Sequence, residues 1–290
     1  YVLDPEQHLL GVTSLRTLFA SEPQQLIKDI MRTSFVSATD QADQEQLSRL
    51  FARHDLMAIP IVDADNRMKG IVTIDDIVDV VEEEATEDIQ KMGGSEALGA
   101  PYLELSFAQM LSKRAGWLCI LFVGEMLTAN AMGHFENEIA KATVLALFVP
   151  LIISSGGNAG SQASTIVIRA LAIGELRLAD WWRVIRREVL TGLVLGCILG
   201  TIGLTRILIW ENVFHSYGSH YLLIGLTVGI SLVGIVLWGT VSGAILPFIL
   251  RRAGFDPASA STPFVATLVD VTGLIIYFTV ASVILRGTLL

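Results

Sequence analysis

A single aspartate lies inside a long apolar run near the carboxyl end of the chain. Asp270 is the only charged residue between Phe264 and Leu285. The run is long enough to cross a lipid bilayer, where an ionised carboxylate is costly unless it faces water, a polar cavity or a cation. The position of Asp270 therefore predicts a cation-binding group inside a membrane span.

The surroundings of Asp270 suit a divalent cation. If the run is a helix, Ala266 and Gly273 lie on the same face as Asp270, so a backbone carbonyl is accessible beside the carboxylate. One carboxylate cannot neutralise a divalent cation, but a twofold axis along a pore would bring two copies of Asp270 together. Charge balance therefore predicts a homodimer. Because Mg²⁺ dehydrates reluctantly, we expect the protein to contact the water shell of hydrated Mg²⁺.

A second polar stretch lies at membrane depth, at residues 154–162. It contains Gly156, Gly157 and Asn158, and Pro150 precedes it. The proline and the paired glycines predict a break in the helix, and exposed backbone carbonyls are tolerated inside a membrane only where they line a cavity. We therefore expect this stretch to line a pore.

Glu125 and Arg206 also carry charge within apolar segments. The two side chains could pair inside a helix bundle or near its outer end. Alternatively, Arg206 could extend to the outer membrane interface. The sequence leaves both arrangements open.

Five segments are apolar and long enough to cross a membrane. They are residues 116–132, 142–173, 189–210, 221–250 and 264–285. Lys and Arg are concentrated in the loops before the first and third segments and after the fourth. Because positively charged loops stay in the cytoplasm, we expect an α-helical polytopic membrane protein with a cytoplasmic amino-terminal part and its carboxyl terminus outside.

Acidic residues are concentrated in the first part of the chain. Residues 1–112 hold 8 Lys and Arg against 20 Asp and Glu, whereas residues 113–290 hold 12 against 9. So large an acidic excess argues against nucleic acid as a partner and favours cations.

Residues 28–88 alternate between helix and strand patterns. We expect a helix from Gln44 to His54, strands at residues 58–63 and 68–73, and a further helix from Ile74. This α/β pattern resembles a CBS domain. Residues 1–27 repeat its last two strands, so we expect the chain to begin within a first CBS unit.

The resemblance to CBS domains implies packing of the units as pairs and an adenine nucleotide site. Thr73 and Asp76 are placed to hold a ribose in the second unit. Arg16 stands where the first unit would need its acidic residue. ATP binding at the CBS units is therefore an open alternative.

A dense acidic run, residues 82–88, follows the CBS pattern. Together with Asp75, Asp76 and Asp79 it places several carboxylates within a few helical turns. Such a run is commonly a solvated helix face. Like charges packed this closely also repel one another until a divalent cation bridges them.

Three segments together resemble the MgtE family of magnesium channels. They are EEEATED at residues 82–88, SGGNAGSQ at residues 155–162 and DVTGLIIYF at residues 270–278. The resemblance implies a homodimeric Mg²⁺ channel in the lipid of a bacterial inner membrane, with five spans per subunit in residues 114–290. It also implies a connecting plug helix within residues 89–113.

The resemblance also assigns roles to residues. In the pore, Ala266 and Asp270 hold hydrated Mg²⁺, with Gly156, Gly157 and Asn158 nearby. A cytoplasmic sensor closes the channel when Mg²⁺ binds to Asp43, Glu45, Asp55, Asp76, Asp79, Glu84, Glu87, Asp88 and Asp256. The family's amino-terminal domain and most of its first CBS unit are absent from this sequence, so we expect weaker closure.

Other functions fit parts of the same pattern. An ion-coupled carrier, or a channel for Mn²⁺ or Co²⁺, would use the same hard oxygen ligands. An intramembrane metalloprotease would need an HExxH motif, which none of the five histidines begins. A regulatory nucleotide-binding module with a membrane anchor would need only one span.

Overall fold

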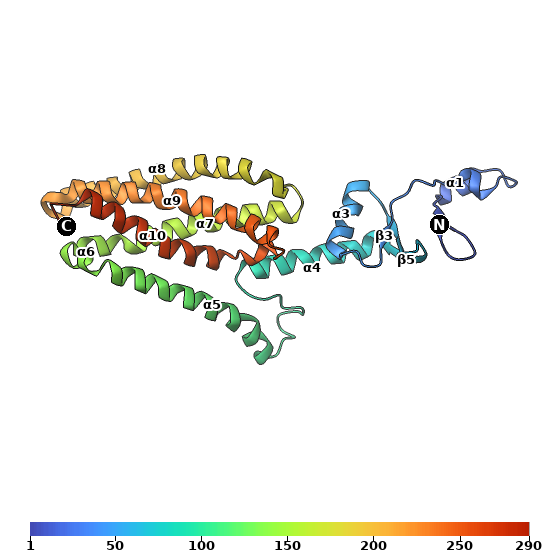
Figure 1. Ribbon diagram of the computed structural model, residues 1–290, viewed down its shortest axis with the longest axis horizontal. Helices are drawn as coiled ribbons and strands as arrows, with labels where there is room; N and C mark the ends of the chain where they lie inside the picture. Colours follow the sequence, from blue (N-terminus) through green and yellow to red (C-terminus); the bar gives the residue numbers. More distant parts are fainter. Residues whose placement is uncertain (290) are drawn as a thin grey trace. The chain divides into compact units, whose positions relative to one another are not determined.

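The computed structural model describes residues 1–289 (Figure 1). The chain folds into two compact units, one from Tyr1 to Thr86 and one that begins at Glu87. The strands lie in the first unit and the long apolar helices in the second.

The first unit contains two small sheets. Its elements are β1 (Val2–Leu3), β2 (Leu9–Gly11), α1 (Leu15–Ala20), α2 (Ile27–Ile30), β3 (Ala38–Thr39), α3 (Gln44–His54), β4 (Ala58–Val62), β5 (Met68–Thr73) and the first part of α4 (Ile74–Met92). β1 pairs antiparallel with β2, while β4 lies between a parallel β3 and an antiparallel β5. The helices and strands predicted between residues 44 and 74 are confirmed.

α3 and α4 pack on the second sheet through apolar side chains. Leu47 and Phe51 of α3 are buried with Ile59 of β4 and Ile77 of α4. β4 is apolar and has no exposed position, whereas β5 has exposed positions at Lys69 and Ile71. This core fixes the positions of the acidic residues on α3 and at the start of α4.

The second unit is helical. It contains α5 (Phe107–His134), α6 (Glu136–Lys141), η1 (Thr143–Phe148), α7 (Val149–Ala172), η2 (Leu178–Asp180), α8 (Trp181–Phe214), η3 (Gly218–His220), α9 (Tyr221–Arg252), η4 (Pro257–Ser259) and α10 (Thr262–Ile284). Five of these helical segments are long and apolar enough to cross a membrane. The five predicted spans are therefore confirmed.

α9 is central in the second unit and packs against α7, α8 and α10, while α5 lies along α10 (Figure 1). Small residues allow the close crossings. A β-carbon at Gly160 of α7 would lie 3.0 Å from the carbonyl oxygen of Gly239 in α9 and 2.8 Å from Val265 Cγ1 in α10. Only glycine permits the three helices to approach this closely.

The break expected in the second span is not present. α7 runs without interruption from Val149 to Ala172, with Pro150 in its first turn, where the missing amide proton removes no helical hydrogen bond. Inside a membrane every backbone group needs a partner, and a continuous helix supplies one. Gly156 instead serves close helix packing, since a β-carbon there would lie 2.7 Å from Val269 Cγ1 of α10.

The connecting segment also differs from the expected helix. Residues 93–106 form turns and irregular structure, and the helical residues at either side belong to α4 and α5. Gly94 and Gly99 adopt φ values of 76° and 70°, and Pro101 follows. These residues end a helix rather than continue one.

Candidate ion-binding site

Three residues of α7 and α10 meet where the sequence places the pore. A β-carbon at Gly157 would lie 3.5 Å both from Ala266 Cβ and from Asp270 Oδ1. The glycine therefore leaves room beside the carboxylate. Asp270 and Ala266 are half-buried within the subunit, so both are accessible from one side.

A polar stripe on α7 begins beside this contact. Ser154, Asn158 and Gln162 follow one another at four-residue spacing and are all exposed. Asn158 Nδ2 donates a hydrogen bond of 3.3 Å to Ser154 Oγ. An exposed row of amides and hydroxyls at membrane depth is favourable only where water or another polar surface covers it.

Gly156 lies on a different side of α7. It is buried, and a β-carbon there would meet Val269 Cγ1 at 2.7 Å as well as the side chain of Ile235. Four of the five expected pore residues thus share one region of α7 and α10, whereas Gly156 belongs to the packed core.

Arg206 lies near the carboxyl end of α8, close to Tyr217 in the connection to α9. Its guanidinium stacks over the ring of Trp210, with 5.1 Å between Cζ and the ring centroid, and donates a hydrogen bond of 3.4 Å to Tyr217 Oη. This arrangement supports the second of the two expectations for Arg206, at the membrane interface. Glu125 has no ion pair with it in the part of the chain that the structure describes.

A lysine bridges two of the carboxylates expected to sense Mg²⁺. Lys91, near the end of α4, donates a hydrogen bond of 2.6 Å to Asp256 Oδ2 and also pairs with Glu87. Partial burial would lower the pKa of Lys91, but its hydrogen bonds to Asp256 and Glu87 outweigh burial and raise that pKa. Glu87 and Asp256 thus face one cation.

The sequence gives only a local signal for Lys91. The Glu87 and Lys91 spacing of four residues on a helix predicts their ion pair. Asp256 lies 165 residues further along the chain. Its contact with Lys91 depends on tertiary structure and could not be predicted from local pattern.

The remaining acidic residues fall into separate local contacts. Asp43 caps α3, Asp55 ends it with a φ of 50°, Glu45 pairs with Arg49 at 2.7 Å, and Glu84 accepts a 2.7 Å hydrogen bond from Gln44. Asp79 and Asp88 lie on α4, and Arg16 lies exposed on α1. The structure brings Glu84 to α3, but it does not gather all these carboxylates into one cluster.

Asp76 and Thr73 are already bonded to each other. The Thr73 hydroxyl donates to Asp76 Oδ2 at 2.7 Å, and the Thr73 amide donates to the same oxygen at 3.1 Å. Both hydrogen bonds lower the pKa of Asp76, and the one from the hydroxyl has the larger effect. Asp76 is exposed, and the pair lies at the start of α4.

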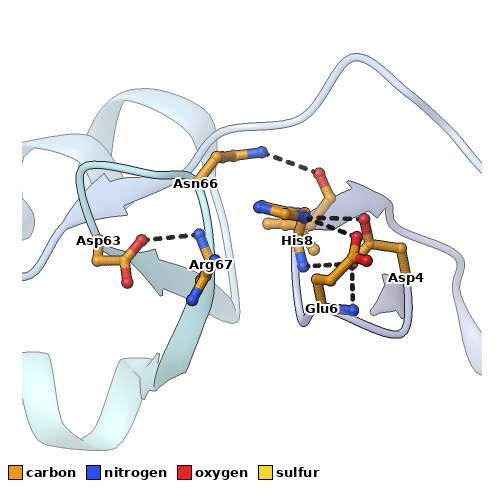
Figure 2. Close-up of polar contacts among 7 residues, drawn as sticks. Asp4, Glu6, His8, Asp63, Asn66 and Arg67 are labelled. Carbon is orange, nitrogen blue, oxygen red and sulfur yellow. Dashed lines mark hydrogen bonds and ion pairs between the residues drawn. The ribbon is translucent and has the colours of Figure 1, made fainter.

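Figure 2 shows a further polar group in the first unit, which the sequence does not single out. Ligand atoms of Asp4, Glu6 and His8 lie within 4.8 Å of one another. Asp4 accepts hydrogen bonds from the amide of Glu6 at 3.0 Å, the amide of His8 at 2.8 Å and His8 Nδ1 at 2.8 Å. These bonds stabilise the turn between β1 and β2 and account for the cluster.

Comparisons with known proteins agree with the division of the chain into two units. The family model MgtE, described as a divalent cation transporter, matches residues 149–280, and the CBS domain model matches residues 27–83. Magnesium transporter MgtE of Thermus thermophilus is 42% identical over 99% of this chain and 62% of its own length. Magnesium transporter MgtE of Enterococcus faecalis is 35% identical over 99% of this chain and 61% of its own length.

The chain therefore spans about three fifths of the length of these curated relatives. A solved structure, described as the cytosolic domain of the Mg²⁺ channel MgtE in complex with ATP, is 41% identical. It covers 28% of this chain and 32% of its own, with a TM-score of 0.27. So low a TM-score says nothing about the arrangement of the present chain.

Proposed function

The chain belongs to the MgtE family of divalent cation transporters, and we propose that it is a Mg²⁺ channel whose ion pathway follows the exposed polar side of α7 and α10. The observation that carries this proposal is the half-buried Asp270 beside Gly157 and the polar stripe of Asn158. A carboxylate, amides and hydroxyls on one side of two membrane helices need an aqueous path or a cation.

Selection would depend on the water shell of the ion. Water bound to Mg²⁺ would donate hydrogen bonds to the carboxylate of Asp270, the carbonyl of Ala266 and the amide oxygen of Asn158. In a homodimer, two copies of Asp270 would balance a charge of +2. The exposed polar stripe on α7 supports a partner subunit, because lipid is a poor neighbour for amides.

Closure would follow cation binding at the cytoplasmic carboxylates. We assign this sensor to the acidic residues on α3, on α4 and at Asp256. Lys91 supports this assignment, because its ammonium lies between Glu87 and Asp256, where a bound cation would lie. When cytosolic Mg²⁺ falls, repulsion between the carboxylates would loosen these contacts and open the path.

ATP at the CBS units belongs to the same proposal. Thr73 and Asp76 would hold the ribose. Arg16, in the part of the first CBS unit at residues 1–27, would bind the phosphates. The placement in the membrane is likewise proposed: a bacterial inner membrane, CBS domain in the cytoplasm and carboxyl terminus outside. Loop charges support this orientation, since Arg183, Arg251 and Arg252 lie at the same end of the bundle as Met92.

A carrier, or a pathway for Mn²⁺ or Co²⁺, is the second candidate, because the oxygen ligands are the same. The test is uptake of Mg²⁺ by liposomes that contain the purified chain, under an inward Mg²⁺ gradient. Single-channel currents are recorded in parallel in a planar bilayer. Uptake above protein-free liposomes with currents far above carrier turnover supports the channel. Slow, saturating uptake supports the carrier, and no uptake overturns both.

A further inference from the structure

α5 packs along α10 through one face. A β-carbon at Gly124 would lie 2.9 Å from Thr267 Cγ2, and Phe135 stacks on Phe278 with 5.0 Å between ring centroids. Toward the other end, Trp117 packs against the start of α10. Trp117, Gly124 and Phe135 are 7 and 11 residues apart, spacings that keep all three on one face of a helix, and the residues next to them lie along the edges of that face.

Glu125 lies at an edge of this contact. It follows Gly124 directly, while Asp270 comes three residues after Thr267, one turn along α10. Because α5 and α10 touch at Gly124 and Thr267, the two carboxylates lie near one helix contact, where like charges repel each other. Glu125 is exposed within the subunit, and α5 buries little of its own surface.

No cation among residues 1–289 forms an ion pair with Glu125. Within residues 1–289 its side chain forms no hydrogen bond or ion pair, and Arg206 is engaged with Trp210 and Tyr217. An ionised carboxylate at mid-span costs several kcal/mol when it faces lipid. Glu125 therefore needs water or a cation on the side where Asp270 lies.

We propose that Glu125 is a second acidic residue of the ion pathway, which acts with Asp270 to attract hydrated divalent cations. This inference rests on the proposed function, and it adds a residue of α5 to a path otherwise formed by α7 and α10. In a homodimer four carboxylates would then face the pathway. Glu125 would act through water bound to the ion, since Mg²⁺ keeps its water shell.

The test compares Glu125→Gln, which removes the charge at nearly constant shape, with Glu125→Asp, which keeps it. Glu136→Gln, in α6 outside the long helices, removes an equal charge as the control. Mg²⁺ uptake is measured against Mg²⁺ concentration. We expect the concentration for half-maximal uptake to rise about three- to tenfold in Glu125→Gln alone, and this effect to weaken with added salt. An unchanged value, or equal changes in both Gln variants, would overturn the inference.

A binding measurement separates this inference from the transport proposal. Mg²⁺ is titrated into the detergent-solubilised chain and its variants, and the heat of binding is recorded. Weaker binding in Glu125→Gln than in Glu136→Gln supports Glu125 as part of the pathway even if the parent chain carries no flux. Equal binding in both variants contradicts it whatever the flux.

Discussion

Lys91 Nζ lies 2.6 Å from Asp256 Oδ2 and joins the end of α4 to the loop before α10. Glu87 pairs with the same ammonium, and Asp256 Oδ1 accepts a 2.8 Å hydrogen bond from the amide of Ala258. Next to this polar contact, Met92 packs against Ala258 and its apolar neighbours. The end of α4 is thus held on the second unit by one cation and an apolar side chain.

If Glu87 and Asp256 bind Mg²⁺, Lys91 competes for the same oxygens. Lys91→Met should therefore lower the Mg²⁺ concentration that halves uptake by about threefold or more, because no ammonium needs to be displaced. Lys91→Arg, which keeps the charge, should stay near the parent. Lys113→Met is the matched control, since Lys113 pairs more loosely with Glu96, at 3.7 Å. Inhibition that is unchanged or needs more Mg²⁺ in Lys91→Met would contradict the competition.

The sensor itself can be tested by removing carboxylates of α4. The channel should close less completely at high cytosolic Mg²⁺ in the triple variant Glu84→Ala/Glu87→Ala/Asp88→Ala, because fewer oxygens remain to bind the ion. The measurement is the fraction of uptake that survives as Mg²⁺ on the CBS side rises. Glu6→Ala/Glu22→Ala, both exposed and outside the proposed sensor, is the control. Inhibition equal to that of the parent would remove these three residues from the sensor.

The crossing of α7 and α9 predicts a stability change. Gly160→Ala places a β-carbon 2.8 Å from Val265 Cγ1, so the helices must separate, and we expect a loss of about 1–3 kcal/mol in the free energy of unfolding. Gly116→Ala, where a β-carbon meets nothing within 4 Å, should leave stability unchanged or slightly raised. Thermal unfolding in detergent measures both. Equal melting temperatures for the two variants would mean that the crossing is looser than described.

Asp63 makes the stability of the first unit depend on acid. Its pKa is lowered chiefly by the hydrogen bond from the amide of Arg67, with smaller contributions from Lys69 and the amide of Asp65 that oppose the effect of burial. A lowered folded-state pKa stabilises the fold above the ordinary carboxyl pKa of about 3.9, and the contribution disappears as the pH falls through the folded value. Asp63→Asn should therefore melt below the parent at pH 7.

The difference in melting temperature between Asp63→Asn and the parent should shrink as the pH falls below about 4. Circular dichroism of thermal unfolding at several pH values follows it. Asp65→Asn, in the same turn, is the control. A difference that stays constant with pH would show that the asparagine acts through geometry rather than charge.

Local pattern predicted much of the fold. β4 follows from a short apolar run and β5 from the turn residues that separate it from β4, while α3 follows from the four-residue spacing of Leu47 and Phe51. The five spans follow from length and apolarity alone. The helix break predicted at Gly156 and Gly157 was wrong, because paired glycines weaken a helix in water but allow close helix packing in a membrane. The helix expected in the connecting segment is absent from residues 93–106, where Gly94 and Gly99 adopt positive φ values that a helix does not allow.

The site was predictable only in part. Asp270 stands out because a charge in an apolar run is rare, and Asn158 because amides at that depth are rare. The contact of Gly124, beside Glu125, with Thr267 of α10 joins residues far apart in the sequence, and so does the contact of Lys91 with Asp256. No local spacing encodes such pairs, because they depend on how the helices pack.

The most direct measurement is Mg²⁺ uptake into liposomes that carry the chain, compared with Asp270→Ala and the isosteric Asp270→Asn. Chromatography and thermal unfolding first establish that both variants keep the fold and oligomeric state of the parent. We predict rapid uptake in the parent and its loss in both variants, because we propose that the carboxylate beside Gly157 and Ala266 holds the hydrated ion. Equal uptake in the parent and in the folded variants would contradict an ion site at Asp270.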